Sequence, residues 1–152
     1  MAKRETVTEL ILEIFRANGR LLAAGDALVA DIGLTSARWQ VLGAMALSPT
    51  PLPVAHIARN MGLTRQAVRR LANEMVRDGL VRFVANPHHR RARLALLTGR
   101  GKAAYNAATS RQEPWADSLA AGLSAKEIEA AAATLRTLRR RLGDNREGNG
   151  DA

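Results

Sequence analysis

A run of basic and amide side chains at helical spacing is the part of this sequence best suited to chemistry. Residues 64–77 read Thr-Arg-Gln-Ala-Val-Arg-Arg-Leu-Ala-Asn-Glu-Met-Val-Arg, with apolar residues on one helical face and polar residues on the other. Glutamine can form two hydrogen bonds with adenine, and arginine can do the same with guanine. We therefore expect this helix to read duplex DNA through an exposed group at its start: Thr64, Arg65, Gln66, Arg69 and Arg70.

A second basic cluster lies in a turn between two predicted strands. The turn reads Asn86-Pro87-His88-His89-Arg90-Arg91-Ala92-Arg93. A basic hairpin can reach into a minor groove, where a narrow A·T tract attracts arginine. We expect Arg90, Arg91 and Arg93 to contact DNA, with Arg91 in the minor groove. Arg93 is placed on a strand, where facing solvent alone is an equal alternative.

The charge of the chain is concentrated in these two clusters. The 152 residues carry a formal charge of +9, and residues 64–93 hold eight arginines against Glu74 and Asp78. A binding face collects charge, whereas a solvated surface spreads it, so a polyanionic partner is indicated. Double-stranded DNA is favoured over an anionic membrane because the arginines do not accompany an aromatic and leucine-rich face.

The composition excludes several other classes of function. The chain has no cysteine, which rules out disulfides, thiolate catalysis and zinc–thiolate sites. Three scattered histidines and the lack of a glycine-rich phosphate loop argue against an enzyme, and no cofactor or metal is predicted. Histidines at the turn instead suggest a modest effect of pH on DNA binding. No apolar run approaches a membrane span, and we expect a cytoplasmic protein.

Hydrophobic spacing predicts the helices that must position these side chains. One helix is expected over residues 6–30, and Thr35 caps a second over residues 36–47. After a proline-rich turn and a very short strand at Leu52, a third helix begins near Pro53 and ends at Gly62. Thr64 then caps the arginine-rich helix, which stops at Gly79. This order of helix, glycine turn and helix is typical of a helix-turn-helix.

The remainder of the chain is expected to complete a winged core and two flanking helices. Strands over residues 80–84 and 92–97 form the wing, with Leu94 and Leu96 on the apolar face. A helix over residues 99–121 is kinked or split by Pro114. A capping box at Ser124 opens a last helix that ends near residue 142, before a disordered tail.

The predicted fold is therefore mainly α with a small β wing, a winged helix-turn-helix core flanked by long dimerisation helices. Its parts are an N-terminal dimerisation helix (residues 1–33), a DNA-binding lobe (34–98), C-terminal dimerisation helices (99–142) and a tail (143–152). Long apolar stripes on the terminal helices favour a homodimer. The alternative is a monomer that folds these helices back on itself.

The ordered motifs resemble the MarR family of bacterial and archaeal transcription regulators. The resemblance covers residues 5–142 and rests on Trp39-Gln40-Val41-Leu42, Leu52-Pro53-Val54-Ala55-His56-Ile57-Ala58, Met61-Gly62-Leu63-Thr64-Arg65-Gln66-Ala67-Val68, Gly79-Leu80-Val81, Arg90-Arg91 and Leu97-Thr98-Gly99-Arg100-Gly101. It implies a dimeric repressor that binds a pseudo-palindromic operator. It also implies release by a small aromatic acid or phenol bound between the dimer helices and the DNA-binding lobe. The oxidant response of some members needs cysteine, which is absent here.

An architectural or weakly specific DNA-binding protein without an effector is the main alternative. It would need the same charge but little sequence discrimination. A reading helix joined to a wing favours specificity, and competition between operator and random DNA separates the two. Neither the effector and its pocket, nor the operator, nor the target genes, nor repression as opposed to activation follows from one sequence.

The wing departs from the family pattern in a way that predicts a strong salt dependence. The pattern has acidic residues at the wing tip, including one that orients the arginine corresponding to Arg91, where this chain has Asn86 and His89. A more basic wing contacts more phosphates and releases more counterions. We expect DNA affinity to fall more steeply with salt than in relatives with an acidic wing. A salt titration with a slope equivalent to only about one or two ions would contradict this.

Overall fold

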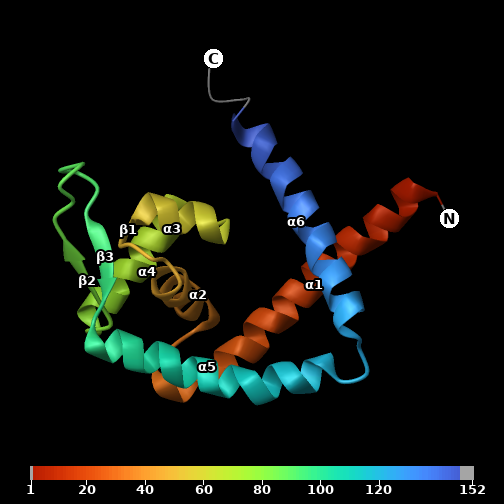
Figure 1. The fold of residues 1–152 in the computed structure, drawn as a ribbon, viewed down its shortest axis with the longest axis horizontal. Helices are drawn as coiled ribbons and strands as arrows, with labels where there is room; N and C mark the ends of the chain where they lie inside the picture. The colour runs from red at the N-terminus through yellow and green to blue at the C-terminus, as the bar shows by residue number, and fades with distance from the viewer. Residues whose placement is uncertain (1, 148–152) are drawn as a thin grey trace. The chain divides into compact units, whose positions relative to one another are not determined.

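The computed structural model describes residues 2–147 as a mainly helical protein with one small antiparallel sheet (Figure 1). This confirms the predicted fold class. The chain divides at Pro114 into two compact units, which are described separately below. No helix within the described residues is long and apolar enough to cross a membrane. The elements in chain order are α1 (Lys3–Val29), η1 (Ala30–Ile32), α2 (Ser36–Ala46), β1 (Leu52–Pro53), α3 (Val54–Met61), α4 (Arg65–Arg77), β2 (Val81–Val84), β3 (Leu94–Leu97), α5 (Gly99–Ala120) and α6 (Ala125–Glu147).

The predicted helix-turn-helix is present, with the expected residues at its ends. Thr35 Oγ1 accepts a hydrogen bond from the Arg38 amide and caps α2, and Thr64 Oγ1 accepts one from Ala67 at 3.1 Å and caps α4. Gly62 ends α3 with φ +66°, a left-handed conformation that favours glycine. Its neighbour Leu63 donates to the Ala58 carbonyl at 3.0 Å, so the turn into α4 is closed by backbone bonds.

The hydrophobic core of the first unit lies between the helix-turn-helix, the sheet and the start of α5. In Figure 1 the sheet runs along one side of the cluster formed by α2, α3 and α4. Burying these apolar side chains is the dominant favourable term in folding such a lobe. Fully buried members come from every layer: Val29, Val41, Leu42, Ile57, Val68, Met75 and Val81.

The sheet corrects one sequence prediction about the wing. Its strand order is β1-β3-β2, and Val81 pairs with Leu97 while Phe83 pairs with Ala95. Residues that pair directly share one face of a sheet. The core-facing residues of β3 are therefore Ala95, which is buried, and Leu97, which packs on the core. The predicted inward pair, Leu94 and Leu96, lies on the other face, because a shift of one residue in a short apolar strand exchanges its faces.

A dense junction joins the end of α4, both ends of the hairpin and the start of α5. Thr98 Oγ1 donates to the Gly79 carbonyl at 2.6 Å and accepts from the Gly101 amide at 3.0 Å, while the Thr98 amide donates to the Leu80 carbonyl. Gly101 is buried, and a Cβ atom there would lie 2.0 Å from the Leu80 carbonyl oxygen. The junction thus needs a residue without a side chain at position 101.

Two polar contacts hold α1 and α5 to the rest of the first unit. The buried Ser36 hydroxyl donates to the Leu22 carbonyl at 2.8 Å, and the space over Gly25 admits that hydroxyl. Arg111 donates to the Leu28 carbonyl at 3.1 Å and pairs with Asp31. The hydrogen bonds from Arg111 hold the pKa of the Asp31 carboxyl below its ordinary value.

The second unit contains the end of α5 and the whole of α6. α5 is a continuous helix through Pro114, so of the two predicted effects of this proline, a kink or a split, the split is wrong. The predicted capping box is present: the Ser124 amide donates to the Glu127 carboxylate at 2.7 Å, and the Glu127 amide donates to the Ser124 hydroxyl. These bonds lower the pKa of Glu127.

The last helix is longer than the sequence predicted. α6 continues to Glu147, five residues past the expected end near residue 142, because Gly143 keeps a helical conformation rather than the left-handed one. Residues 143–147, which the sequence analysis assigned to the tail, form the end of α6. Residues 148–152, the rest of that tail, lie outside the described residues.

We predict that Gly101→Ala strongly destabilises the first unit. The new methyl would meet the Leu80 carbonyl oxygen, so backbone must move, at a cost of about 1–3 kcal/mol of unfolding free energy. Chemical denaturation monitored by circular dichroism measures this loss. Gly99→Ala is the matched control, because nothing lies within 4 Å of a Cβ there. Equal stability of the two variants would show that the junction is not tight.

Candidate nucleic-acid interface

The helix α4 presents its predicted reading face to solvent. Val68, Leu71, Ala72 and Met75 bury the apolar side of the helix in the core. The burial of this side fixes the rotation of α4, so the opposite side must face outward. The residues predicted to read DNA are all exposed on the outward side: Thr64, Arg65, Gln66, Arg69 and Arg70. Gln66 and Arg70 also line an open depression with Arg77 and Glu74, and no wing residue is among the described residues that line it.

The acidic residues at the end of α4 are paired with an arginine that the sequence analysis did not single out. Arg38, on the first turn of α2, donates to Asp78 at 2.8 Å and to Glu74 at 3.4 Å. Its side chain is only 19% exposed, so these bonds are partly shielded from water. The pairing offsets part of the negative charge of the two acids and ties the end of α4 to α2. The sequence analysis could not find this ion pair, because Arg38 and Asp78 are forty residues apart and no local pattern links them.

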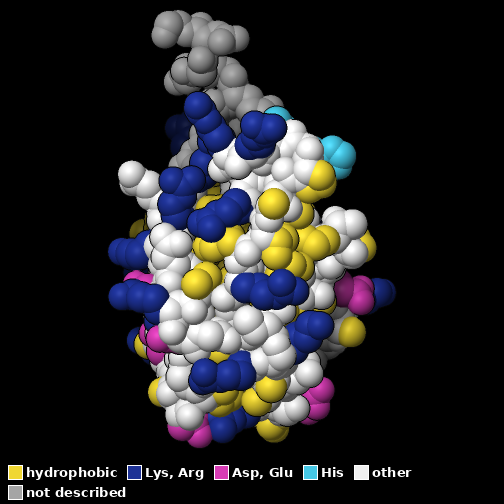
Figure 2. Space-filling model, turned by 90° about the vertical axis from the view of Figure 1, so that its left-hand side faces the viewer, with side chains coloured by type: hydrophobic (Ala, Val, Ile, Leu, Met, Phe, Trp, Pro, Cys, Tyr) yellow, Lys and Arg dark blue, Asp and Glu magenta, His cyan; other side chains and the backbone are white. Residues whose placement is uncertain are grey.

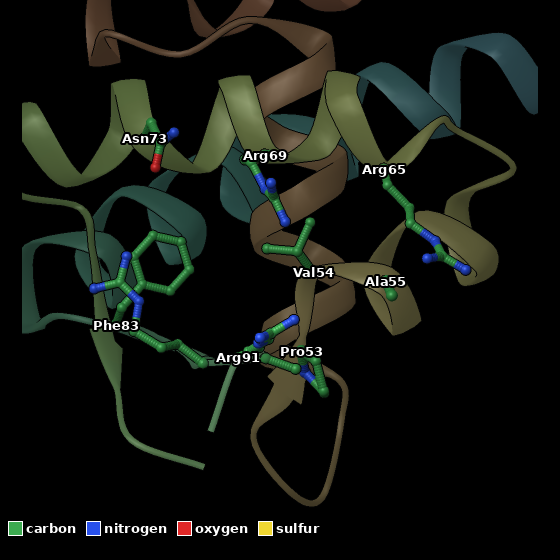
Figure 3. Close-up of a pocket in the computed structure, with 10 residues that line it drawn as sticks. Pro53, Val54, Ala55, Arg65, Arg69, Asn73, Phe83 and Arg91 are labelled. Atoms are coloured by element: carbon green, nitrogen blue, oxygen red, sulfur yellow. The ribbon is translucent and has the colours of Figure 1, made fainter. Parts of the chain in front are cut away.

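A groove of about 420 Å³ brings the two predicted clusters together. Arg65 and Arg69 reach it from α4, and Arg91 and Arg93 reach it from the wing. Figure 3 shows the side chains of Arg69 and Asn73 pointing from α4 toward the wing side of this groove. Apolar residues complete its wall: Pro53, Val54, Ala55, Phe83 and Ala92. No acidic side chain is among the described residues that line it, so the groove is suited to an anion.

Asn73 is a lining residue that the sequence analysis did not name. It is exposed on the third turn of α4, and it lines both this groove and the open depression beside it. Its amide can donate two hydrogen bonds and accept others. Helical spacing could have found it, because Asn73 follows Gln66 and Arg69 by seven and four residues on the same side.

Arg93 is anchored rather than left alone in solvent. Its guanidinium carbon lies 4.7 Å from the centre of the Phe83 ring, within the range of a cation–π contact. Arg93 lies two residues before Ala95, and Ala95 pairs with Phe83. Because side chains two residues apart in an extended chain point to the same face, the side chains of Arg93 and Phe83 lie on one face of the sheet. Arg93 is exposed and rests on the Phe83 ring, and its contact with DNA stays a prediction.

The wing tip is organised by Asn86. Its side-chain oxygen accepts a hydrogen bond from the His88 amide at 3.0 Å, which forms an Asx turn. Asn86 therefore serves a local structural purpose at the position where the family pattern has an acid. Arg90 and Arg91 are exposed, and neither belongs to an ion pair among the described residues. Arg90 does not line the groove, whereas Arg91 does.

The space-filling view from the wing side shows how these charges spread over one face. In Figure 2 Lys and Arg side chains lie across the face around an apolar patch, with acidic side chains toward its margins and histidine at the upper edge. No cluster of three or more potential metal ligands occurs within the described part of the chain. The chemistry available on this face is thus anion binding and hydrogen bonding.

Comparison with known sequences relates the chain to regulators. A family model described as MarR family matches residues 32–92. An uncharacterized protein of Mycobacterium tuberculosis is 34% identical over 134 residues, which cover 88% of this chain and 92% of that protein. The transcriptional activatory protein BadR of Rhodopseudomonas palustris is 34% identical over 104 residues, or 66% of this chain and 59% of BadR.

Comparison with solved structures gives the same relation for nearly the whole chain. A MarR family transcriptional regulator from Streptomyces coelicolor is 31% identical, with a TM-score of 0.77 and coverage of 91% of this chain and 96% of that one. The regulator MosR of Mycobacterium tuberculosis, in complex with DNA, is 25% identical with a TM-score of 0.74 and coverage of 87% and 96%. CouR of Rhodococcus jostii, bound to p-coumaroyl-CoA, is 22% identical with a TM-score of 0.77 and coverage of 85% and 90%.

We predict that Gln66→Ala weakens binding to a cognate duplex more than binding to random DNA. Loss of an adenine contact should cost about 1–3 kcal/mol on the cognate site alone. Fluorescence anisotropy with both duplexes measures the difference. Gln112→Ala, an exposed glutamine on α5, is the matched control and should change neither affinity. Equal losses on both duplexes would make Gln66 a phosphate contact instead of a base contact.

Proposed function

The chain belongs to the MarR family of DNA-binding transcription regulators, and we propose that it acts as a homodimeric repressor of a pseudo-palindromic operator. The observation that carries this proposal is the groove in which arginines of α4 and of the wing converge, with no acidic side chain among the described residues that line it. An electropositive reading helix beside an electropositive hairpin matches two adjacent grooves of B-form DNA. Such a protein acts where the DNA is, which is why we place it in the cytoplasm.

In the proposed complex, α4 enters the major groove and the wing enters the neighbouring minor groove. Gln66 and Arg69 contact base edges, since both are exposed on the first turns of α4. Arg65 and Arg70 contact bases or phosphates, and Thr64 contacts a phosphate while it caps the helix. Arg91, at the wing, inserts into the minor groove, and Arg90 contacts the backbone beside it.

Exposed apolar residues on the terminal helices support a homodimer. In the first unit, α1 exposes a group of large apolar side chains, with Phe15 71% exposed; the others are Ile11, Leu12, Leu21 and Leu22. In the second unit, α6 exposes apolar residues at a spacing of seven: Ile128, Leu135 and Leu142. A heptad repeat of this kind is typical of helices that pack against other helices. Burying these stripes in a second copy would give a two-fold dimer and hence a two-fold operator.

The proposed effector is a small aromatic or phenolic molecule that releases the operator. CouR, a regulator of the same fold, has been seen with p-coumaroyl-CoA, which contains a phenolic group. A ligand that binds the DNA-free form better than the DNA-bound form must lower DNA affinity by the same factor. The name of BadR, an activatory protein, makes activation the competing outcome.

The first test selects duplexes from a random library with the full-length protein. We expect an inverted repeat whose half-sites lie about one helical turn apart, and a complex that contains two protein chains. Competition with random DNA should then show at least about a thousandfold preference. No enriched sequence, or equal binding to random DNA, would favour an architectural DNA-binding protein.

A second test screens aromatic acids and phenols by thermal shift and by operator release. A true effector should raise the melting temperature and loosen the operator at matching concentrations, because both effects come from one binding equilibrium. Transcription from the operator measured in vitro then separates repression from activation. Compounds that stabilise the protein without affecting DNA binding would contradict the proposed release mechanism.

A further inference from the structure

We propose that the groove between α4 and the wing seats the DNA strand that separates the major groove from the minor groove. In this arrangement Arg93 contacts a phosphate of that strand, and Phe83 is the residue that positions Arg93. The inference rests on the proposed function, because it assumes that α4 and the wing enter adjacent grooves. It adds a site for the strand and a role for Phe83.

The geometry of the duplex requires a strand at this place. Adjacent major and minor grooves are separated by a single sugar–phosphate strand. If α4 occupies one groove and the wing tip the other, that strand must cross the surface between them. The surface in question is the groove lined by Arg65 and Arg69 on one side and by Arg91 and Arg93 on the other.

The chemistry of the lining suits a phosphate strand. Its arginines supply charge-assisted donors, the Asn73 amide supplies a neutral donor, and no acidic side chain lines the groove among the described residues. Glu74 and Asp78, the acids at the end of α4, do not line the groove, and both are paired with Arg38. The side chains of the wall that includes Pro53 and Val54 are apolar and can pack against the sugars of the strand.

The contact with Phe83 leaves Arg93 free to bind an anion. The guanidinium carbon of Arg93 lies 4.7 Å from the ring centre, and a cation–π contact of this kind uses none of the hydrogen-bond donors of the arginine. The ring itself is held in place, because Phe83 is half-buried against the core and pairs with Ala95. An arginine that is already ordered loses less side-chain entropy when it binds. Phe83 thereby acts on DNA affinity through Arg93.

The test compares variants of the full-length protein on a selected operator and on a random duplex, over a range of salt concentrations. Arg93→Ala should weaken both duplexes equally, by about fivefold or more, and should lower the salt slope by about one. Phe83→Leu should cause most of the same loss, and Phe83→Tyr, which keeps the ring, should restore binding. In the Arg93→Ala background, Phe83→Leu should have no further effect.

Arg82→Ala is the matched control for charge. Arg82 is exposed on the same strand as Phe83, pairs with Leu96 on the opposite face, and does not line the groove. Its removal should change the salt slope by less than half as much as Arg93→Ala. An equal change for both would show that Arg93 contributes only general charge, and this would overturn the strand contact.

Two further outcomes would overturn the role of Phe83. One is a loss for Phe83→Leu that is as large without Arg93 as with it, since the ring would then act through the fold alone. The other is a loss for Phe83→Tyr as large as that for Phe83→Leu. If Phe83→Leu does not fold, as judged by circular dichroism, the tyrosine and Arg93 variants still decide the matter. A wild-type protein that binds both duplexes equally would contradict sequence-specific regulation, while the comparisons on random DNA would still test the strand contact.

Discussion

The junction around Thr98 is the constraint on which the geometry of the DNA-binding face depends. The side chain of Thr98 donates to the Gly79 carbonyl and its amide donates to the Leu80 carbonyl, while Gly101 packs against the same Leu80 carbonyl. The end of the reading helix, the root of the wing and the start of α5 therefore meet at one point. Because β2 starts directly after this point, the distance between α4 and the wing is set by covalent and hydrogen-bonded neighbours. A looser joint would leave two basic elements without a defined groove between them.

The arrangement of charged side chains makes the groove between α4 and the wing electropositive. Four arginines converge there, and like charges brought together oppose folding unless solvent or partners offset them. The protein keeps its two nearby acids out of the groove by pairing Glu74 and Asp78 with Arg38 on α2. The uncompensated positive charge is thus left for a polyanion. The same pairing ties the end of α4 to α2 and adds to the burial of the apolar side of α4, which fixes the rotation of the helix.

Much of the fold could be predicted from local sequence signals. Thr35 and Thr64 as caps, Gly62 as the left-handed end of α3, and the capping box at Ser124 are all present, because each depends on bonds within a few residues. The errors arose where residues nearby in the sequence do not determine the local structure. The prediction assigned the wrong residues of β3 to the core, because Leu94 to Leu97 is apolar on both faces and alternation does not mark the buried one. Pro114 does not split α5, and Gly143 does not end α6.

The sequence by itself determined which side of α4 faces solvent, and therefore that Arg65, Gln66, Arg69 and Arg70 are exposed. A helical period and a cap are sufficient for that conclusion. Only the tertiary structure decided which of these residues meet the wing, since that depends on pairings between distant segments. Arg38 with Asp78, Asn73 beside the wing, and Arg93 over Phe83 are separated by between ten and forty positions in the chain. Contacts at such separations follow from packing and strand register, which local periodicity does not specify.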